Sequence, residues 1–370
     1  MDFRLDSEQQ MLQDSVRRYI DKAYAFEAGA KPGKGASLAH WGAFADNGWL
    51  AAALPEAHAG LGGGLVETAL IAHEFGRGLV REPYLGCAVV AAQTLAAAGT
   101  AAQQERWLPA LADGSVRIAL AYSEPASRGM PLPVATVARS RAGGYLISGR
   151  KSLVLSGLVA QHYIVSARVE GAAADEVSLF LVDVDAPGLQ RQALPLHDGS
   201  WAEELVLDGV QVPADAVLGE AGKGLAALRA GLAHGTVALG AELVGAMEKV
   251  IELTADYLKT RQQFGVPIGS FQALQHRVAD MAIEMETARS MLHAALAAME
   301  REDDAARQRT LSAAKALIAR AAKFVCGQGI QLHGGIGVTE EYVVGHYFKR
   351  AVVGELLLGS IDRHEAACMA

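Results

Sequence analysis

Three long segments with helical periodicity follow one another toward the C-terminus, and they limit the possible folds more than any other feature. Apolar residues recur at helical spacing near Leu225–Lys259, Phe271–Arg301 and Ala305–Leu332. Helices of this length joined by short turns are typical of antiparallel bundles. Together with the apolar stretch that ends the chain, they predict a C-terminal four-helix bundle in residues 220–370, after a Gly-rich loop.

The first part of the chain is also predicted to be helical. The letters SEQQ place Gln10 three residues after Ser7, which is the spacing of a capping box, and apolar residues then recur at helical spacing. Further amphipathic runs separated by turns are Leu38–Ala53, Val66–Val80, Cys87–Ala98 and Ala101–Ala112. We therefore expect a helical N-terminal domain in residues 1–116.

Residues 117–219 have a different composition, richer in β-branched and aromatic residues. Short pieces are separated by Gly, Pro and Asp, among them RIALAYSEP, HYIVSARV, VSLFLVDVD and AEELVLDGVQVP. They predict a central β domain, either a small sheet or a barrel. The order helical, β, helical places the chain in the α+β class with three domains.

Composition and charge exclude several functional classes. The chain has 370 residues, of which 51% are hydrophobic and 20% charged, so it can bury a large core. A net charge of −8 without a basic stripe argues against a nucleic-acid partner. The opening MDFRLDSEQQ has no leader pattern and no apolar run is long enough for a membrane span, so we expect a cytoplasmic protein.

Generic motifs for nucleotides and metals are absent. The sequence has no G-x-G-x-x-G after a predicted strand, no Walker loop, no H-E-x-x-H and no C-x-x-C. Its three cysteines, Cys87, Cys326 and Cys368, are scattered and fit a reducing compartment. We therefore expect neither a metal site nor a disulfide framework.

Two C-terminal motifs are more specific. RQQFGVPIGSFQALQH starts at Arg261 and surrounds a turn between two predicted helices with a cation, the ring of Phe264 and an amide. QLHGGIG, Gln331–Gly337, places paired glycines just past a helix, where backbone amides can approach a ligand. Taken singly, each has an ordinary interpretation: a helix cap, a core phenylalanine and an ion-paired arginine.

Together these motifs give the whole chain a resemblance to the acyl-CoA dehydrogenase family. AYSEP at the start of the β region, TEEY and FKRA after QLHGGIG, and the domain order agree with it. The opening MDFRLDSEQQ and the segment FGRGLVREPYLG further resemble the small-subunit type of pimeloyl-CoA and steroid-side-chain dehydrogenases. The resemblance implies FAD-dependent conversion of an acyl-CoA to a 2,3-enoyl-CoA, with electron-transferring flavoprotein as the acceptor.

The resemblance also assigns cofactor-binding roles. Residues that match the family's FAD contacts are Ser123, Arg261, Phe264, Gln272, Gln331, His333, Gly334, Gly335 and Ser360. In the family, the motifs from Arg261 and from Gln331 reach across a subunit interface and serve the neighbour's flavin.

The chain departs from the family where its own flavin is held. SEPASRG lacks the usual Gly-Ser-Asp, and LVLSG at Leu153–Gly157 replaces Trp-Ile-Thr-Asn-Gly, so a stacking ring and a hydroxyl donor are lost.

The catalytic base raises the main question. The family's glutamate directly precedes a glycine in the last helical segment, and the matching residue in VVGELLLGSID is Leu358, which cannot accept a proton. The family's other location for a base falls near Gly235 and Thr236. Loss of a positioned base costs roughly 10²- to 10⁴-fold in rate. Glu355, about one helical turn before Leu358, is a candidate displaced base, although an ordinary solvated glutamate is the alternative.

Three functions follow from this pattern. The leading hypothesis is a hetero-oligomer with a related subunit that contributes the glutamate. The second is an autonomous homodimeric or homotetrameric enzyme that uses Glu355, with Asp362 and Glu242 as further carboxylates that we interpret as surface charges. The third is a non-catalytic subunit that binds acyl-CoA or flavin.

Overall fold

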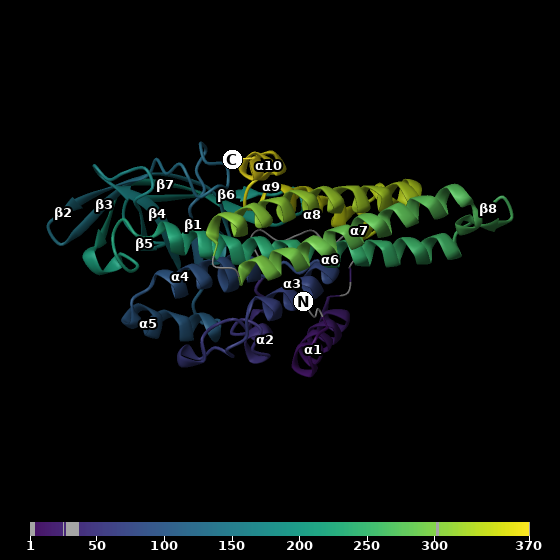
Figure 1. Ribbon diagram of the computed structural model, residues 1–370, viewed down its shortest axis with the longest axis horizontal. Helices are drawn as coiled ribbons and strands as arrows, with labels where there is room; N and C mark the ends of the chain where they lie inside the picture. Colours follow the sequence, from purple (N-terminus) through teal and green to yellow (C-terminus); the bar gives the residue numbers. More distant parts are fainter. Residues whose placement is uncertain (1–3, 25, 27–36, 301–302, 370) are drawn as a thin grey trace. The chain divides into compact units, whose positions relative to one another are not determined.

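The structure, a computed structural model, describes residues 4–24, 26, 37–300 and 303–369 (Figure 1). It consists of two compact units. Unit 1 contains Met1–Lys31, Ala69–Val80 and Thr236–Ala370, and unit 2 contains Pro32–Thr68 and Arg81–Gly235. The first three residues of the MDFRLDSEQQ opening, and the predicted helix end at residue 301, lie outside the described residues.

Unit 1 is built from helices, and it confirms the long helices that periodicity predicts. Those lying wholly or mainly in it are α1 (Ser7–Ala23), α3 (Leu65–Gly78), α6 (Leu225–Thr260), α7 (Gln272–Met299), α8 (Asp304–His333), α9 (Val344–Leu356) and α10 (Ile361–Met369). Helix α6 is long and apolar enough to cross a membrane, but 78% of the relevant window is buried. It is therefore explained as a core helix.

The predicted capping box of α1 is wrong by one residue. The N-cap is Asp6, whose carboxylate accepts from the backbone amide of Gln9 at 2.8 Å. The Gln9 side chain in turn accepts from the Asp6 amide at 3.3 Å. Because a carboxylate caps a helix as well as a hydroxyl does, Asp6 takes the position that the sequence pattern assigned to Ser7.

Helices α1, α3 and α6 of unit 1 are joined by a buried cluster of charges. The carboxylate of Glu74 is 1% exposed and accepts from Arg17 at 2.7 Å, and it also contacts His73 at 3.1 Å. The other ring nitrogen of His73 lies 3.1 Å from Glu248. Burial raises the pKa of Glu74, but the hydrogen bonds from His73 and Arg17 outweigh it and lower this pKa to about 2.

Acid is expected to weaken unit 1 through Glu74. A carboxyl whose pKa is lower in the folded than in the unfolded state stabilises the fold above its unfolded pKa of 4.5, and this contribution is lost as the pH falls toward about 2. The shift corresponds to about 3 kcal/mol. Denaturant titrations from neutral to acidic pH should therefore show a shallower pH dependence for Glu74→Gln than for the wild type. Equal slopes would contradict the assignment.

Unit 2 contains the central sheet and the remaining N-terminal helices. The helical elements are α2 (Trp41–Asp46), a π-helical segment (Tyr84–Ala91), α4 (Ala92–Ala98) and α5 (Ala101–Ala112). The strands are β1 (Ile118–Ala121), β2 (Val137–Arg141), β3 (Gly144–Leu155), β4 (His162–Val169), β5 (Val177–Asp183), β6 (Leu189–Pro195) and β7 (Trp201–Pro213). They form one sheet in the order β1-β4-β2-β3-β7-β6, with β5 also paired to β4.

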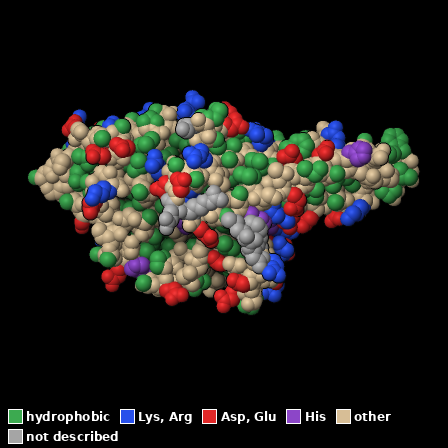
Figure 2. Space-filling model, in the orientation of Figure 1, with side chains coloured by type: hydrophobic (Ala, Val, Ile, Leu, Met, Phe, Trp, Pro, Cys, Tyr) green, Lys and Arg blue, Asp and Glu red, His purple; other side chains and the backbone are tan. Residues whose placement is uncertain are grey.

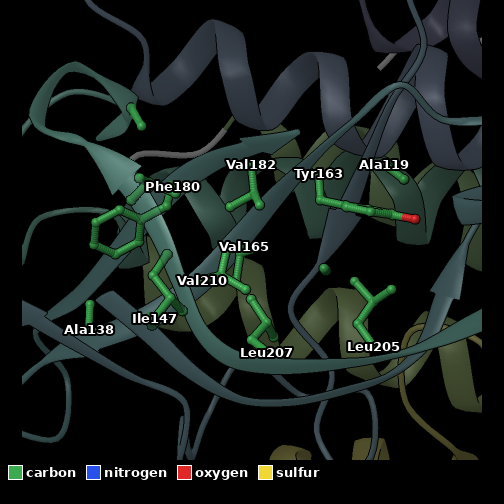
Figure 3. Packing of buried hydrophobic residues seen from close by; sticks show 14 of the residues in the cluster. Ala119, Ala138, Ile147, Tyr163, Val165, Phe180, Val182, Leu205, Leu207 and Val210 are labelled. Carbon is green, nitrogen blue, oxygen red and sulfur yellow. The ribbon is translucent and has the colours of Figure 1, made fainter. Parts of the chain in front are cut away.

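One large cluster of buried residues in unit 2 lies on one face of this sheet. Figure 3 shows Ile147, Tyr163, Val165 and Phe180 packed together, and all four side chains are fully buried. Ile164, which lies between Tyr163 and Val165 on β4, points to the other face and is also fully buried, so this part of the sheet is covered on both faces. The α+β class with helical, sheet and helical parts in sequence order is confirmed.

One local expectation was wrong, and one strand was not predicted. The helix predicted over Leu38–Ala53 is reduced to α2, because the backbone turns left-handed at Gly48 with φ +74° just after the helix ends. Strand β6 was not anticipated, since five of its seven residues are exposed and it carries almost no apolar alternation. Pairing with β7 holds it in the sheet instead.

Candidate functional site

The RQQFG motif forms an exposed hairpin in unit 1. The short strands β8 (Gln262–Gln263) and β9 (Val266–Pro267) pair between α6 and α7. Phe264 occupies the turn with φ +56°, and its side chain is 92% exposed. The alternative interpretation of Phe264 as a core residue is therefore wrong. An exposed aromatic ring on a left-handed backbone is unfavourable for an isolated chain and is typical of a contact surface.

The neighbouring motif residues are equally accessible. Gln272, the first residue of α7, is exposed, as is Arg261. Arg261 has no ion-pair partner among residues 4–24, 26, 37–300 and 303–369, so the ordinary ion-pair interpretation does not explain it. Figure 2 shows hydrophobic side chains reaching the surface at the end where Figure 1 labels β8. A cation, an amide and an aromatic ring are thus presented together on the bundle surface.

The QLHGGIG motif lies at the same end of the bundle. The ring of His333 on α8 packs against Tyr257 of α6 at a centroid distance of 4.5 Å and against Tyr342 at 4.9 Å. It is buried, its Nδ1 lies 2.7 Å from the carbonyl oxygen of Gly329, and burial lowers its pKa. His333 therefore supports the loop from within rather than presenting its ring at the surface.

The glycines of this motif leave open space for a ligand. Gly334 has φ +63°, and a Cβ atom added at Gly334 or Gly335 would meet no other atom within 4 Å. Gln331, in the last turn of α8, is exposed. The backbone here can therefore be approached closely from outside, as the motif predicted.

The turn between α9 and α10 is held by buried donors from α8 and α10. Leu358 is 6% exposed and left-handed with φ +58°. Its carbonyl oxygen accepts from His364 Nε2 at 2.8 Å. The ammonium of Lys315 donates to the carbonyl oxygens of Gly354 and Gly359 at 3.1 and 3.2 Å. A cation at the end of α9 satisfies carbonyls that the helix leaves unpaired.

The carboxylates near Leu358 are either paired or exposed. Glu355, the candidate displaced base, forms an ion pair with Lys323 and its side chain is 20% exposed. Glu242 accepts two hydrogen bonds from Arg350. Asp362 is exposed in the first turn of α10. The structure therefore leaves no unpaired buried carboxylate among these three candidates near the buried Leu358.

The remaining predicted residues lie apart from the hairpin. Ser360 is half-buried just before α10, and its carbonyl oxygen accepts from the His364 amide at 3.1 Å. Gly235 and Thr236, the second location for a base, lie within α6. Along α8, Lys315 under the α9–α10 turn is about 24 Å from Gln331, at 1.5 Å per residue. The turn and the flavin motifs of one chain are thus not brought together within unit 1.

In unit 2 the SEP motif is organised by a buried ion pair that sequence reasoning missed. Glu124 accepts from Lys151 at 2.6 Å and from the hydroxyl of Thr136 at 2.7 Å. The Lys151 side chain is fully buried, so burial lowers its pKa to about 8 even though Glu124 opposes this. The hydroxyl of Ser123 accepts from the Gly129 amide at 3.1 Å, which leaves its own proton available to a ligand.

The LVLSG turn is strained and firmly held. Leu153 and Ser156 are both left-handed, with φ +54° and +61°. The carbonyl oxygen of Gly157 accepts from Arg191 at 3.2 Å, and Arg191 pairs with buried Glu203 at 3.0 Å. The backbone shape of the turn is therefore maintained although a leucine replaces the hydroxyl that the family uses here.

Comparison with known proteins gives consistent matches. Family models described as the N-terminal, middle and C-terminal domains of acyl-CoA dehydrogenase match residues 6–115, 119–210 and 222–368. The acyl-CoA dehydrogenase fadE12 of Mycobacterium tuberculosis is 31% identical over 336 residues, covering 88% of this chain and 83% of that protein.

Two solved structures are also similar over almost the whole chain. A structure described as a variant of the Tcur3481-Tcur3483 steroid ACAD is 32% identical with a TM-score of 0.84, and it covers 98% of this chain and 96% of that one. The ChsE4-ChsE5 complex from Mycobacterium tuberculosis is 26% identical with a TM-score of 0.87, covering 99% and 97%.

Proposed function

The chain belongs to the acyl-CoA dehydrogenase family, and on that premise we propose that it works as one subunit of a hetero-oligomer whose partner subunit supplies the catalytic glutamate. The family's activity is FAD-dependent dehydrogenation of the CH–CH bond of an acyl-CoA. The proposal concerns how this chain takes part in that activity.

The observation that carries the proposal is the environment of Leu358. The reaction needs a carboxylate that removes the α proton of the thioester. A buried leucine stands where the family places this group, and Glu355 and Glu242 are engaged with Lys323 and Arg350. The turn itself is nevertheless fixed by Lys315 and His364. The chain therefore keeps the local backbone and lacks the base.

The exposed hairpin and the QLHGGIG loop fit a role toward FAD. When bound, FAD accepts the hydride from the β carbon. Arg261 would pair with its pyrophosphate and Phe264 would cover part of its adenine half, while Gly334 and Gly335 allow close backbone approach. Since all of these residues face outward from unit 1, we propose that they complete a neighbouring subunit's cofactor site.

The similar structures support an assembly of two kinds of chain. One is described as a complex of ChsE4 with ChsE5, and the other pairs Tcur3481 with Tcur3483. Exposed apolar side chains on unit 1, including Val266, Ile336 and Val338, also favour a protein partner.

Three further proposals follow from the family resemblance and the sequence. We propose that electron-transferring flavoprotein is the electron acceptor and that the protein is cytoplasmic. We also propose domain boundaries at 1–116, 117–219 and 220–370.

Glu355→Gln separates this proposal from the alternative of an autonomous enzyme. Because Glu355 is paired with Lys323, we expect the substitution to leave turnover of the assembled enzyme within about twofold, well short of the loss of a base. The measurement is kcat at saturating acyl-CoA, with Asp362→Asn as a matched control for an exposed carboxylate on the same segment. A loss of about a hundredfold or more with FAD still bound would establish Glu355 as the base.

A further inference from the structure

The second half of helix α3 crosses α6 at backbone contact distance within unit 1. A Cβ atom added at Gly76 of α3 would lie 1.9 Å from the carbonyl oxygen of Glu242, and one added at Gly245 of α6 would lie 2.0 Å from that of His73. Since neither helix has a Cβ atom at the contact, little side-chain area interdigitates there. The charged residues beside the crossing are therefore well placed to fix α3 against α6.

His73 lies beside this crossing and joins one carboxylate from each helix. Its Nδ1 is 3.1 Å from Glu74 of α3, and its Nε2 is 3.1 Å from Glu248 of α6. A neutral imidazole has a single N–H, so it would donate to one carboxylate and turn a lone pair toward the other. Only the imidazolium donates at both ends. The bridge between the two helices therefore requires a proton on His73.

The surrounding charges favour that proton. The charged groups of the cluster and its edges, taken helix by helix, are Arg17 of α1, Glu74 and Arg77 of α3, Glu242, Glu248, Lys249 and Glu252 of α6, Glu286 and Arg289 of α7, and Arg350 of α9. Burial lowers the pKa of His73, but the hydrogen bonds to Glu248 and Glu74 outweigh it, so the pKa is raised above 6.5. The arginines in the cluster therefore do not displace the proton.

The sign of the pH effect follows from this shift. A histidine whose pKa is raised by folding stabilises the fold below its unfolded pKa of 6.5, and the contribution is lost as the pH rises through the folded value. Burial lowers the pKa of Lys151 and Lys315 to about 8, so their loss of protons stabilises the fold instead. A loosening of unit 1 on the alkaline side is thus expected from His73 and not from these lysines.

Two further helices are attached to α3 at the same place. Arg17 and Gln13 of α1 donate to Glu74 at 2.7 and 3.1 Å. The hydroxyl of Tyr347 on α9 donates to the carbonyl oxygen of Arg77. Displacement of α3 from α6 therefore also disturbs the attachment of α1 and α9.

We propose that His73 is a proton-dependent clasp in unit 1: its imidazolium holds α3 to α6, and loss of the proton lets α3 open locally together with α1. Histidine is the side chain whose charge ordinarily changes near neutral pH, so the clasp makes the attachment of these helices responsive to pH. The inference goes beyond the proposed function and does not depend on which subunit supplies the glutamate.

Amide hydrogen exchange of the full chain, measured by mass spectrometry at about pH 6 and about pH 8.5 and corrected for intrinsic rates, tests the clasp without FAD or turnover. In the wild type, protection of α3 and α1 relative to α8 should fall about tenfold at the higher pH, because a charge-assisted hydrogen bond is lost. His73→Gln cannot be protonated and should give the lower protection at both pH values.

His346→Gln is the matched control in unit 1. Its Nε2 is paired with one exposed carboxylate, that of Glu340 at 3.6 Å, instead of lying between two. This variant should keep the pH response of the wild type. A milder test of the clasp itself is Glu248→Gln, since Glu248 is 25% exposed. It removes one of the two carboxylates that hold the proton, so α3 should lose protection at a lower pH than in the wild type.

Three results would overturn the inference. The first is wild-type protection of α3 that stays constant relative to α8 between the two pH values. The second is the same pH response in His73→Gln as in the wild type. The third is an equal loss of protection in α3, α1 and α8, which would show global destabilisation of unit 1 instead of a local clasp. Whether a partner supplies the glutamate is decided separately, by turnover in the assembled enzyme.

Discussion

Lys151→Met is expected to destabilise unit 2 by about 3–5 kcal/mol, which is the usual cost of breaking a buried ion pair from one side. The ammonium is fully buried and pairs with Glu124, which also accepts from the Ala135 and Thr136 amides at 2.7 and 3.1 Å. Removing the lysine leaves a carboxylate of the SEP turn without its counter-ion. Guanidinium titration followed by circular dichroism would measure the loss.

Two controls make this prediction specific. Adding Glu124→Gln to Lys151→Met removes the uncompensated charge and should recover part of the stability. Lys223→Met breaks an ion pair with Glu220 at 2.6 Å in which both side chains are over 70% exposed, so little change is expected. The account of the SEP turn would be wrong if Lys151→Met behaved like Lys223→Met.

Arg261→Met combined with Phe264→Ala is expected to weaken FAD binding by the assembled enzyme at least about a hundredfold. The substitutions remove a cation and a ring that are exposed in unit 1, so the stability of the chain itself should hardly change. FAD retained after gel filtration of the co-expressed subunits, followed by fluorescence titration of the apoprotein, gives the affinity.

The matched control for this variant is Arg320→Met. Arg320 is a cation on α8 that pairs with Glu365 and lies outside both FAD motifs. It should leave FAD content unchanged. If the double variant also retained its FAD, the hairpin would serve only subunit packing, and the proposed role of Arg261 and Phe264 in a neighbour's cofactor site would fail.

The sequence predicted the elements better than the electrostatics. Helical period and turn residues located α6, α7 and α8 to within a few residues, because each helix buries a continuous apolar face. Strand β6 was not predicted, because it is short and polar. Its place in the sheet is fixed by pairing with β7 rather than by an apolar pattern in its own residues. Tertiary pairing of this kind leaves no local pattern in the sequence.

For the candidate site, motifs identified residues but not their surroundings. The exposure of Phe264 could not be foreseen, because a ring in a turn is as compatible with a core as with a surface. Lys151 and Lys315 were missed because a lysine is normally exposed, and only the fold reveals the carboxylate and carbonyls that each one serves. The departure at Leu358 was visible in the sequence, and the structure adds that the residue is buried in a fixed turn.

The most direct test of the central claim is an anaerobic visible spectrum of the purified chain, before and after addition of a panel of acyl-CoAs. The account predicts that the chain alone is colourless or keeps an unbleached flavin, and that bleaching and turnover appear once a related subunit with the family's glutamate is added. FAD near one per chain that bleaches without any partner would contradict it, and would identify this chain as a complete enzyme.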